Sequence, residues 1–219
     1  MITYEENAFY EVVVPHDWMI GQAENLYEDS VGWYRNRIEL NPKAQRNYFL
    51  RFEGVYMDCT VFVNGQQAGE WKYGYTTFEV NITPFVRQGE NEILVMVVHQ
   101  CPNSRWYTGA GIYRPVWLVE KESAYFAADG IYIHTEKISG GYRAEISAEL
   151  VLPEGESAAD YQVSYQVFDK EKKVVAEAVI SAENAATDLV VENAEEWSVK
   201  TPYLYELRAE LMRAGSRKT

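Results

Sequence analysis

The sequence is poor in the residues that most often build metal and redox sites. Its 219 residues include only three histidines, His16, His99 and His134, and two cysteines, Cys59 and Cys101. The histidines lie far apart in sequence, without the four-residue spacing of paired zinc ligands on a helix. Two cysteines do not make a disulfide framework, and because both lie next to apolar residues we expect two buried, reduced thiols. The sequence therefore predicts no metal site and no cofactor.

The sequence also lacks positive charge and long apolar runs. Its formal net charge is −13, which argues against nucleic acid or an anionic membrane as a partner. The longest apolar run, residues 93–98, has the length of a strand buried on both faces and is far too short to span a membrane. Residues 1–18 contain neither the basic region nor the apolar region of a signal peptide. We therefore expect a cytoplasmic protein that is not secreted.

Helical periodicity is missing as well, whereas a period of two residues recurs along the chain. Apolar and polar residues alternate at 48–52, 142–150 and 161–167. Such alternation is typical of antiparallel strands with one face in water. Aromatic residues make up 14% of the chain, including 17 tyrosines, and they also favour strands. The sequence predicts an all-β protein.

Two local signals predict specific turns. Asn64-Gly65 follows an apolar run and predicts a type I′ hairpin, because that turn needs positive φ at both central residues. Residues 83–87 are expected to form one helical turn, with Thr83 as its cap and Pro84 at its first position.

The spacing of the predicted strands changes near residues 121–123. Before this point the strands are separated by long aromatic loops, which suits a jelly-roll β-sandwich over residues 1–121. After it, about seven strands follow at the short spacing of an immunoglobulin- or fibronectin-like sandwich over residues 122–219. Residues 211–219 look like one strand and half a hairpin, so we expect this second sandwich to be truncated at its C-terminal end.

Residues 104–114, Ser-Arg-Trp-Tyr-Thr-Gly-Ala-Gly-Ile-Tyr-Arg, combine three aromatic residues, two arginines and two glycines. Aromatic faces pack on the C–H bonds of sugars, guanidinium groups donate to hydroxyls, and glycine lets a backbone approach closely. A purely structural interpretation is also open, in which Trp106 and Tyr113 fill the core and Arg105 pairs with a nearby acid.

This segment resembles a stretch in the N-terminal sugar-binding domain of glycoside hydrolase family 2, the β-galactosidase, β-glucuronidase and β-mannosidase family. Other motifs of the family occur, in the family's order, at residues 15–18 (PHDW), 32–35 (GWYR), 52–55, 61–65, 74–78, 82–86 and 197–207. The last motif departs from the family pattern at Val199 or Lys200, where many members have a proline. The resemblance covers nearly the whole chain.

The resemblance implies retaining hydrolysis of a terminal β-linked sugar by two glutamates of a (β/α)₈ barrel that follows the second sandwich. Such a barrel needs about 250 residues, and no barrel fits after Glu210. We therefore expect a chain without catalytic residues that is inactive alone, with an oligosaccharide substrate bound mainly by the barrel. Homo-oligomerisation of the full-length enzyme stays open.

The same resemblance assigns Arg105, Trp106 and Tyr107 to one wall of the substrate pocket. Some β-galactosidases have a cation-binding aspartate just before the tryptophan. Asn103 and Ser104 stand there in this sequence, so the resemblance does not carry that metal site over.

The sequence also allows other interpretations of the chain's function and of single residues. The chain could be a free-standing carbohydrate-binding module, or a structural or adhesive pair of sandwiches. His16 and Asp17 form a possible acid–base pair, although a structural turn with Trp18 as a core anchor is favoured. His99 and His134 are expected to be satisfied core or rim groups. Trp33, Trp71 and residues 73–75 are expected in the core or at its corners, with an exposed rim at Trp71 and Tyr73 as the alternative.

Overall fold

The computed structural model describes residues 8–21, 24, 28–101 and 109–215. The chain divides into two compact units, Met1–Glu122 and Ser123–Thr219, and both are built almost wholly of antiparallel strands. The all-β prediction is confirmed. Within the described ranges, no helix has the length and apolar character needed to cross a membrane.

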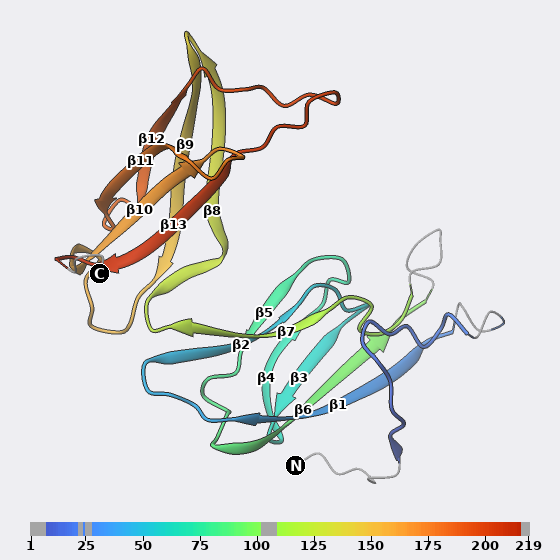
Figure 1. Ribbon diagram of the computed structural model, residues 1–219. Coiled ribbons are helices and arrows are strands. Elements are labelled where there is room, and N and C mark those ends of the chain that lie inside the picture. The colour runs from blue at the N-terminus through green and yellow to red at the C-terminus, as the bar shows by residue number, and fades with distance from the viewer. Residues whose placement is uncertain (1–7, 22–23, 25–27, 102–108, 216–219) are drawn as a thin grey trace. The chain divides into compact units, whose positions relative to one another are not determined.

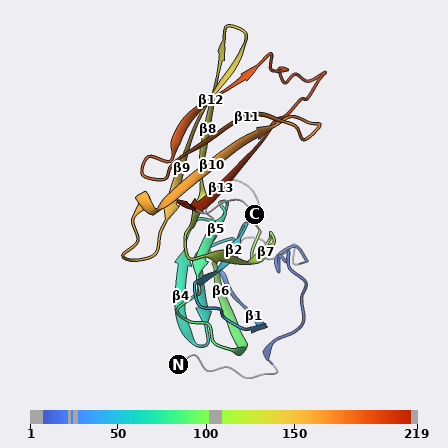
Figure 2. The same ribbon diagram turned by 60° about the vertical axis from the view of Figure 1, so that its left-hand side comes forward.

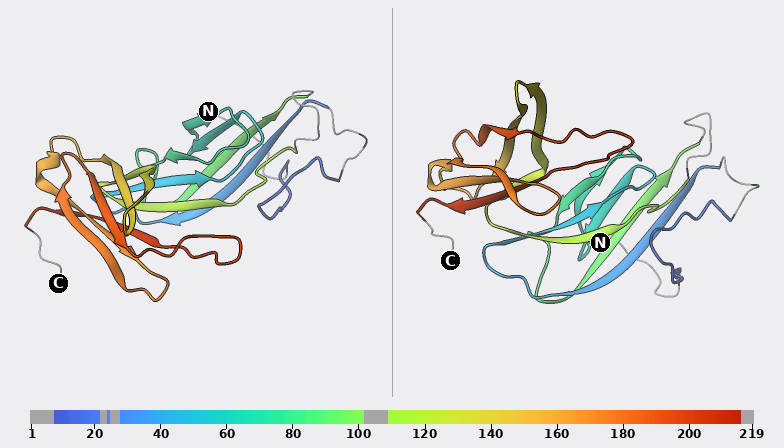
Figure 3. Two further views of the ribbon diagram at one scale, coloured as in Figure 1. Left: turned by 90° about the horizontal axis from the view of Figure 1, so that it is seen from above. Right: turned by 45° about the horizontal axis from the view of Figure 1, so that its top comes forward.

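The first unit contains two antiparallel sheets (Figure 1). The four-stranded sheet has the order β1-β6-β3-β4, and the three-stranded sheet has the order β5-β2-β7. Their strands are β1 (Ser30–Leu40), β2 (Arg46–Phe52), β3 (Cys59–Val63), β4 (Gln66–Trp71), β5 (Phe78–Asn81), β6 (Gly89–His99) and β7 (Val116–Glu122). Strands β1 and β6 pair along their full length, from Ser30 opposite His99 to Leu40 opposite Gly89 (Figure 3).

The alternation along β2 explains how the first core forms. Tyr48, Leu50 and Phe52 are buried in one cluster with Val61 and Val63 of the facing sheet. Phe49 lies on the opposite side of the strand and is also buried, because the ammonium group of Lys121 covers its ring at 4.7 Å. Strand β2 is therefore less amphipathic than its sequence suggests.

The predicted hairpin is confirmed. Asn64 and Gly65 have φ values of 50° and 78° and join β3 to β4, with Val63 opposite Gln66. The helical turn after β5 also forms, because the Ile82 carbonyl accepts from both Phe85 and Val86.

The predicted cap of that helical turn is wrong. The Asn81 side chain accepts from the Thr83 amide at 2.9 Å, and the Thr83 hydroxyl accepts from the Tyr48 amide at 2.8 Å. Thr83 therefore anchors the turn to β2 instead of capping it.

The second unit pairs two three-stranded sheets, β12-β9-β8 and β11-β10-β13 (Figure 2). Six strands are described where about seven were expected: β8 (Tyr125–Ile138), β9 (Gly141–Val151), β10 (Tyr161–Phe168), β11 (Val174–Ser181), β12 (Ala186–Glu192) and β13 (Glu206–Arg213). Tyr161, Val163, Tyr165 and Val167 fill the core, as their alternation predicted. The buried Tyr165 hydroxyl donates to the Ala185 carbonyl at 2.8 Å.

Both cysteines are free, but only Cys59 is buried. Cys101 is partly exposed and lies two residues after the end of β6, so the prediction of two buried thiols is wrong for this residue. His99 is buried, and its Nδ1 lies 3.1 Å from the Glu28 carbonyl. The buried ring therefore has a hydrogen-bond partner, as expected. His134 is exposed on β8.

Candidate functional site

The segment that follows residues 102–108 is tied to the PHDW motif through its backbone. The His16 amide donates to the Ile112 carbonyl at 2.7 Å, and the Trp18 amide donates to the Ala110 carbonyl at 3.1 Å. The Asp17 carboxylate accepts from the Ala110 amide at 3.1 Å. Asp17 therefore holds a loop in place, which supports the structural interpretation of the His16-Asp17 pair.

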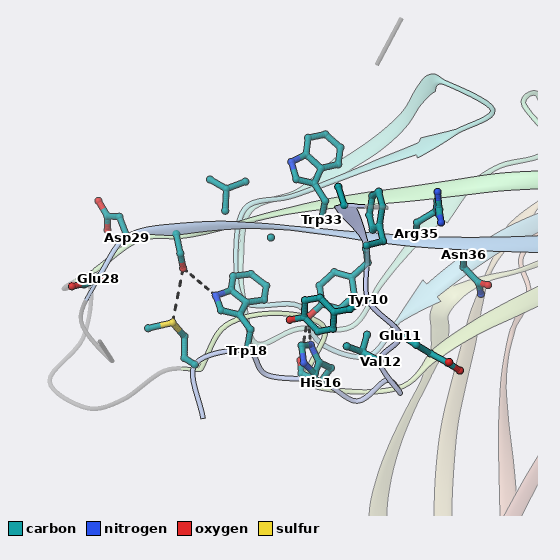
Figure 4. Close-up of a pocket in the computed structure, with 17 residues that line it drawn as sticks. Tyr10, Glu11, Val12, His16, Trp18, Glu28, Asp29, Trp33, Arg35 and Asn36 are labelled. Atoms are coloured by element: carbon teal, nitrogen blue, oxygen red, sulfur yellow. Dashed lines mark hydrogen bonds between the residues drawn. The ribbon is translucent and has the colours of Figure 1, made fainter. Parts of the chain in front are cut away.

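Tyr34, in the GWYR motif of β1, joins the same two segments through its side chain. Its hydroxyl lies 2.9 Å from His16 Nδ1 and accepts from the Ile112 amide at 3.3 Å. Burial raises the pKa of Tyr34 to about 12, so the hydroxyl stays protonated at neutral pH. The Trp18 indole packs beside Tyr34 and donates to the Ser30 hydroxyl at 3.1 Å (Figure 4).

Gly111 lies at the centre of this arrangement, where only glycine fits. Its amide and carbonyl both bond with the backbone of Tyr56 at 2.9 Å. Its φ is +122°, and a Cβ placed there would lie 2.3 Å from the Tyr34 hydroxyl and 2.7 Å from the His16 carbonyl. Both the backbone conformation and the close packing therefore exclude a side chain.

Three motifs that are distant in sequence thus meet at one place, a base formed by residues 16–18, Tyr34 and residues 110–112. The predicted pocket-wall residues Arg105, Trp106 and Tyr107 lie outside the described residues. Asn103 and Ser104 also lie outside them.

Next to this base lies an open groove of about 1050 Å³ between residues 8–19 and strand β1. Tyr10 and Trp18 lie on one side of β1 and Trp33 on the other, and Arg35 and Asn36 add polar groups (Figure 4). The Arg35 guanidinium lies 4.6 Å over the Phe9 ring. Flat apolar faces beside hydrogen-bond donors are suited to contact with a polyhydroxylated ligand.

The described carboxyl groups with shifted pKa values do not suit acid–base catalysis. The pKa of Glu156 is lowered by its hydrogen bonds with Tyr161 and Arg213. Lysine partners lower the pKa values of Glu196 and Glu206. A general acid needs the opposite shift. Among the described residues, no three His, Cys, Asp or Glu side chains cluster as metal ligands would.

The aromatic residues that were expected in the core or at its corners are partly exposed. Trp33 packs on Phe62 with ring centroids 5.9 Å apart but stays partly exposed. Trp71, Tyr73 and Tyr75 are likewise partly exposed, which favours the alternative of an exposed rim. Tyr56 carries no sequence signal of its contact with Gly111, because an isolated antiparallel bridge between two loops brings the two residues together.

Comparison with known proteins decides the family. Residues 1–122 match the sugar-binding domain of glycosyl hydrolases family 2, and residues 126–218 match a second domain of that family. This chain belongs to glycosyl hydrolase family 2. The predicted resemblance is confirmed.

Relatives within the family are long enzymes. The chain is 31% identical to a β-galactosidase of Bacteroides ovatus over 96% of its own length and 27% of that protein. It is 29% identical to a putative β-glucuronidase of Formosa agariphila, over 91% of its own length and 20% of the relative. The crystal structure of an FMN-binding β-glucuronidase from Facaelibacterium prausnitzii superimposes with a TM-score of 0.82 at 27% identity, covering 93% of this chain and 34% of that one. The chain thus spans about a fifth to a third of these relatives.

Proposed function

We propose that this chain is the non-catalytic, N-terminal part of a retaining glycosidase that hydrolyses terminal β-linked sugars of the β-galactoside or β-glucuronide type. The observation that carries the proposal is family 2 membership together with coverage of only 27% of a β-galactosidase and 20% of a putative β-glucuronidase. In this proposal residues 1–121 are the jelly-roll sugar-binding domain and residues 122–219 are the immunoglobulin-like sandwich.

The chemistry in the parent protein belongs to two glutamates of a (β/α)₈ barrel. One protonates the leaving oxygen, and the other attacks the anomeric carbon to form a glycosyl-enzyme. The role of this chain is to hold residues 102–108 against the pocket that the barrel forms. The bonds of Gly111, Asp17 and Tyr34 support this role, because they fix the segment that follows the loop.

In the pocket, the Trp106 ring would stack on the apolar face of the sugar, and the Arg105 guanidinium would donate to its hydroxyls. Tyr107 would complete the wall. The oligosaccharide is then the partner of the whole protein, and this chain contributes specificity without performing the reaction.

The proposal is tested by trapping the intermediate in the parent protein. A 2-deoxy-2-fluoro glycosyl fluoride of galactose or glucuronic acid accumulates the covalent intermediate, and peptide mapping then identifies the labelled residue. We expect the label on a glutamate outside residues 1–219. A label on a carboxylate within this chain, or turnover without any covalent intermediate, would contradict the proposal.

The pocket wall is tested separately with Trp106→Ala in the parent protein. Loss of a stacking face should lower kcat/KM about tenfold, which corresponds to about 1.4 kcal/mol, with little change in Tm. If Trp106 instead fills the core, the same change should reduce stability by about 3–5 kcal/mol and leave the kinetics of the folded fraction normal. Trp197→Ala, which removes an exposed tryptophan of the second unit, is the matched control and should change neither property.

A further inference from the structure

Three aromatic rings form a parallel column that runs from the core of the first unit to its surface. Phe52 and Phe78 stack with centroids 4.9 Å apart and planes 11° apart. Phe78 and Trp71 continue the stack at 5.4 Å and 12°. Exposure rises along the column, from 1% at Phe52 and 6% at Phe78 to 40% at Trp71. The tryptophan therefore has one covered face and one open face.

The position of Trp71 explains this arrangement. It ends β4, the edge strand of the four-stranded sheet, and its partner across the sheet is the buried Cys59. Its side chain accordingly closes the core at the side, over the edge strand β5 that carries Phe78. The indole N–H donates to the Thr76 hydroxyl at 3.2 Å. Stacking and this hydrogen bond fix the orientation of the outer face before any ligand arrives.

The following segment adds two further rings that are held in place. Tyr73 and Tyr75 contact each other edge to face at 5.7 Å, and Tyr75 contacts Tyr56 at 5.3 Å. Between them, the Gly74 carbonyl accepts from the Tyr113 hydroxyl at 2.7 Å. The segment thus packs on the side chain of Tyr56, whose backbone bonds with Gly111, although Tyr73 itself stays 58% exposed.

We propose that Trp71 and Tyr73 form a binding platform for the pyranose rings of an oligosaccharide. A pyranose offers an apolar C–H face for a fixed aromatic ring and hydroxyls for polar neighbours. The residues on either side of Trp71, Glu70 and Lys72, are both exposed and charged. This setting suits a sugar better than a protein partner, because the centre of a protein interface is depleted of charge. The inference goes beyond the proposed function and requires no hydrolytic activity.

The geometry of the platform also sets the affinity that we expect for sugars. Two rings on an open surface cover only one side of each sugar, so a monosaccharide should bind too weakly to titrate. A polysaccharide presents many copies of the ligand, and its binding should therefore be measurable.

Affinity electrophoresis of this chain in native gels tests the platform. The gels contain a soluble β-galactan, galactomannan, xyloglucan or mixed-linkage β-glucan. We expect at least one polymer to retard the unmodified chain, and Trp197→Ala, a matched control that is 59% exposed in the second unit, to be retarded equally. Tyr73→Ala should raise the dissociation constant at least about threefold and Trp71→Ala about tenfold.

Two results would overturn the platform. One is the absence of retardation by every polymer, and the other is retardation that neither substitution weakens. Because Trp71 also closes the core, Trp71→Ala is paired with a thermal melt, whereas the exposed Tyr73 is expected to be substituted without loss of folding. Neither result depends on the trapping experiment, so the platform and the proposed activity can fail independently.

Discussion

Substituting Gly111 by alanine tests how the site is assembled. Gly111 has φ of +122°, and its added Cβ would lie 2.3 Å from the Tyr34 hydroxyl and 2.7 Å from the His16 carbonyl. The His16 oxygen belongs to a backbone that is itself bonded to Ile112. The clash therefore cannot be relieved by moving one flexible side chain.

Gly65→Ala provides the reference for backbone strain. Gly65 also has a positive φ, +78°, but nothing lies within 4 Å of its added Cβ. Its substitution should cost about 1–2 kcal/mol for the left-handed backbone alone. Gly111→Ala should add about 1–3 kcal/mol for overpacking, giving a total of about 2–5 kcal/mol.

Amide hydrogen exchange measures both the size and the place of the effect. In Gly111→Ala, the amides of His16, Trp18 and Tyr56 should exchange faster, because their acceptors are the carbonyls of residues 110–112. In Gly65→Ala, the exchange rates of these three amides should keep the same ratios to one another as in the unmodified chain. If these amides were equally protected from exchange in both variants, the three motifs would not depend on contact at Gly111, and the reasoning would be refuted.

Further predictions concern the Tyr165 hydroxyl and the two cysteine thiols. Tyr165→Phe should destabilise the second unit by about 0.5–1.5 kcal/mol in urea unfolding, because the Ala185 carbonyl loses one of its two donors and keeps the Ala148 amide. Iodoacetamide should label Cys101 in the folded chain, faster as the pH rises, and reach Cys59 only after unfolding. Burial raises the pKa of Cys59 from 9.0 to about 12, so its contribution to stability is complete below pH 9 and is lost as the pH rises toward 12. Cys59→Ala should therefore lose less stability than the unmodified chain as the pH rises from 9 toward 12.

Alternation and turn chemistry predicted much of the fold, because they are local. Tyr48, Leu50 and Phe52 face the core as their spacing indicated, and Asn64-Gly65 forms its hairpin. Phe49 was missed because its cover comes from Lys121, a residue of another strand. Thr83 was assigned as a cap because its bond with Tyr48, 35 residues away, leaves no local trace.

The site was predictable as motifs but not as an arrangement. The sequence identified residues 15–18, 32–35 and 104–114 separately, and only the fold brings His16, Tyr34 and Gly111 into contact. Trp71 was expected in the core or at a corner for a related reason. Composition cannot tell a buried ring from one that covers the core with one face and meets water with the other.

Activity of the purified chain is the most direct test of the account. Residues 1–219 are incubated with aryl β-galactosides, β-glucuronides and β-mannosides, and the released aryl group is compared with that from a heat-killed control. We expect no turnover above the control, because both the general acid and the nucleophile are assigned to the barrel. Turnover that persists through purification to homogeneity would contradict it.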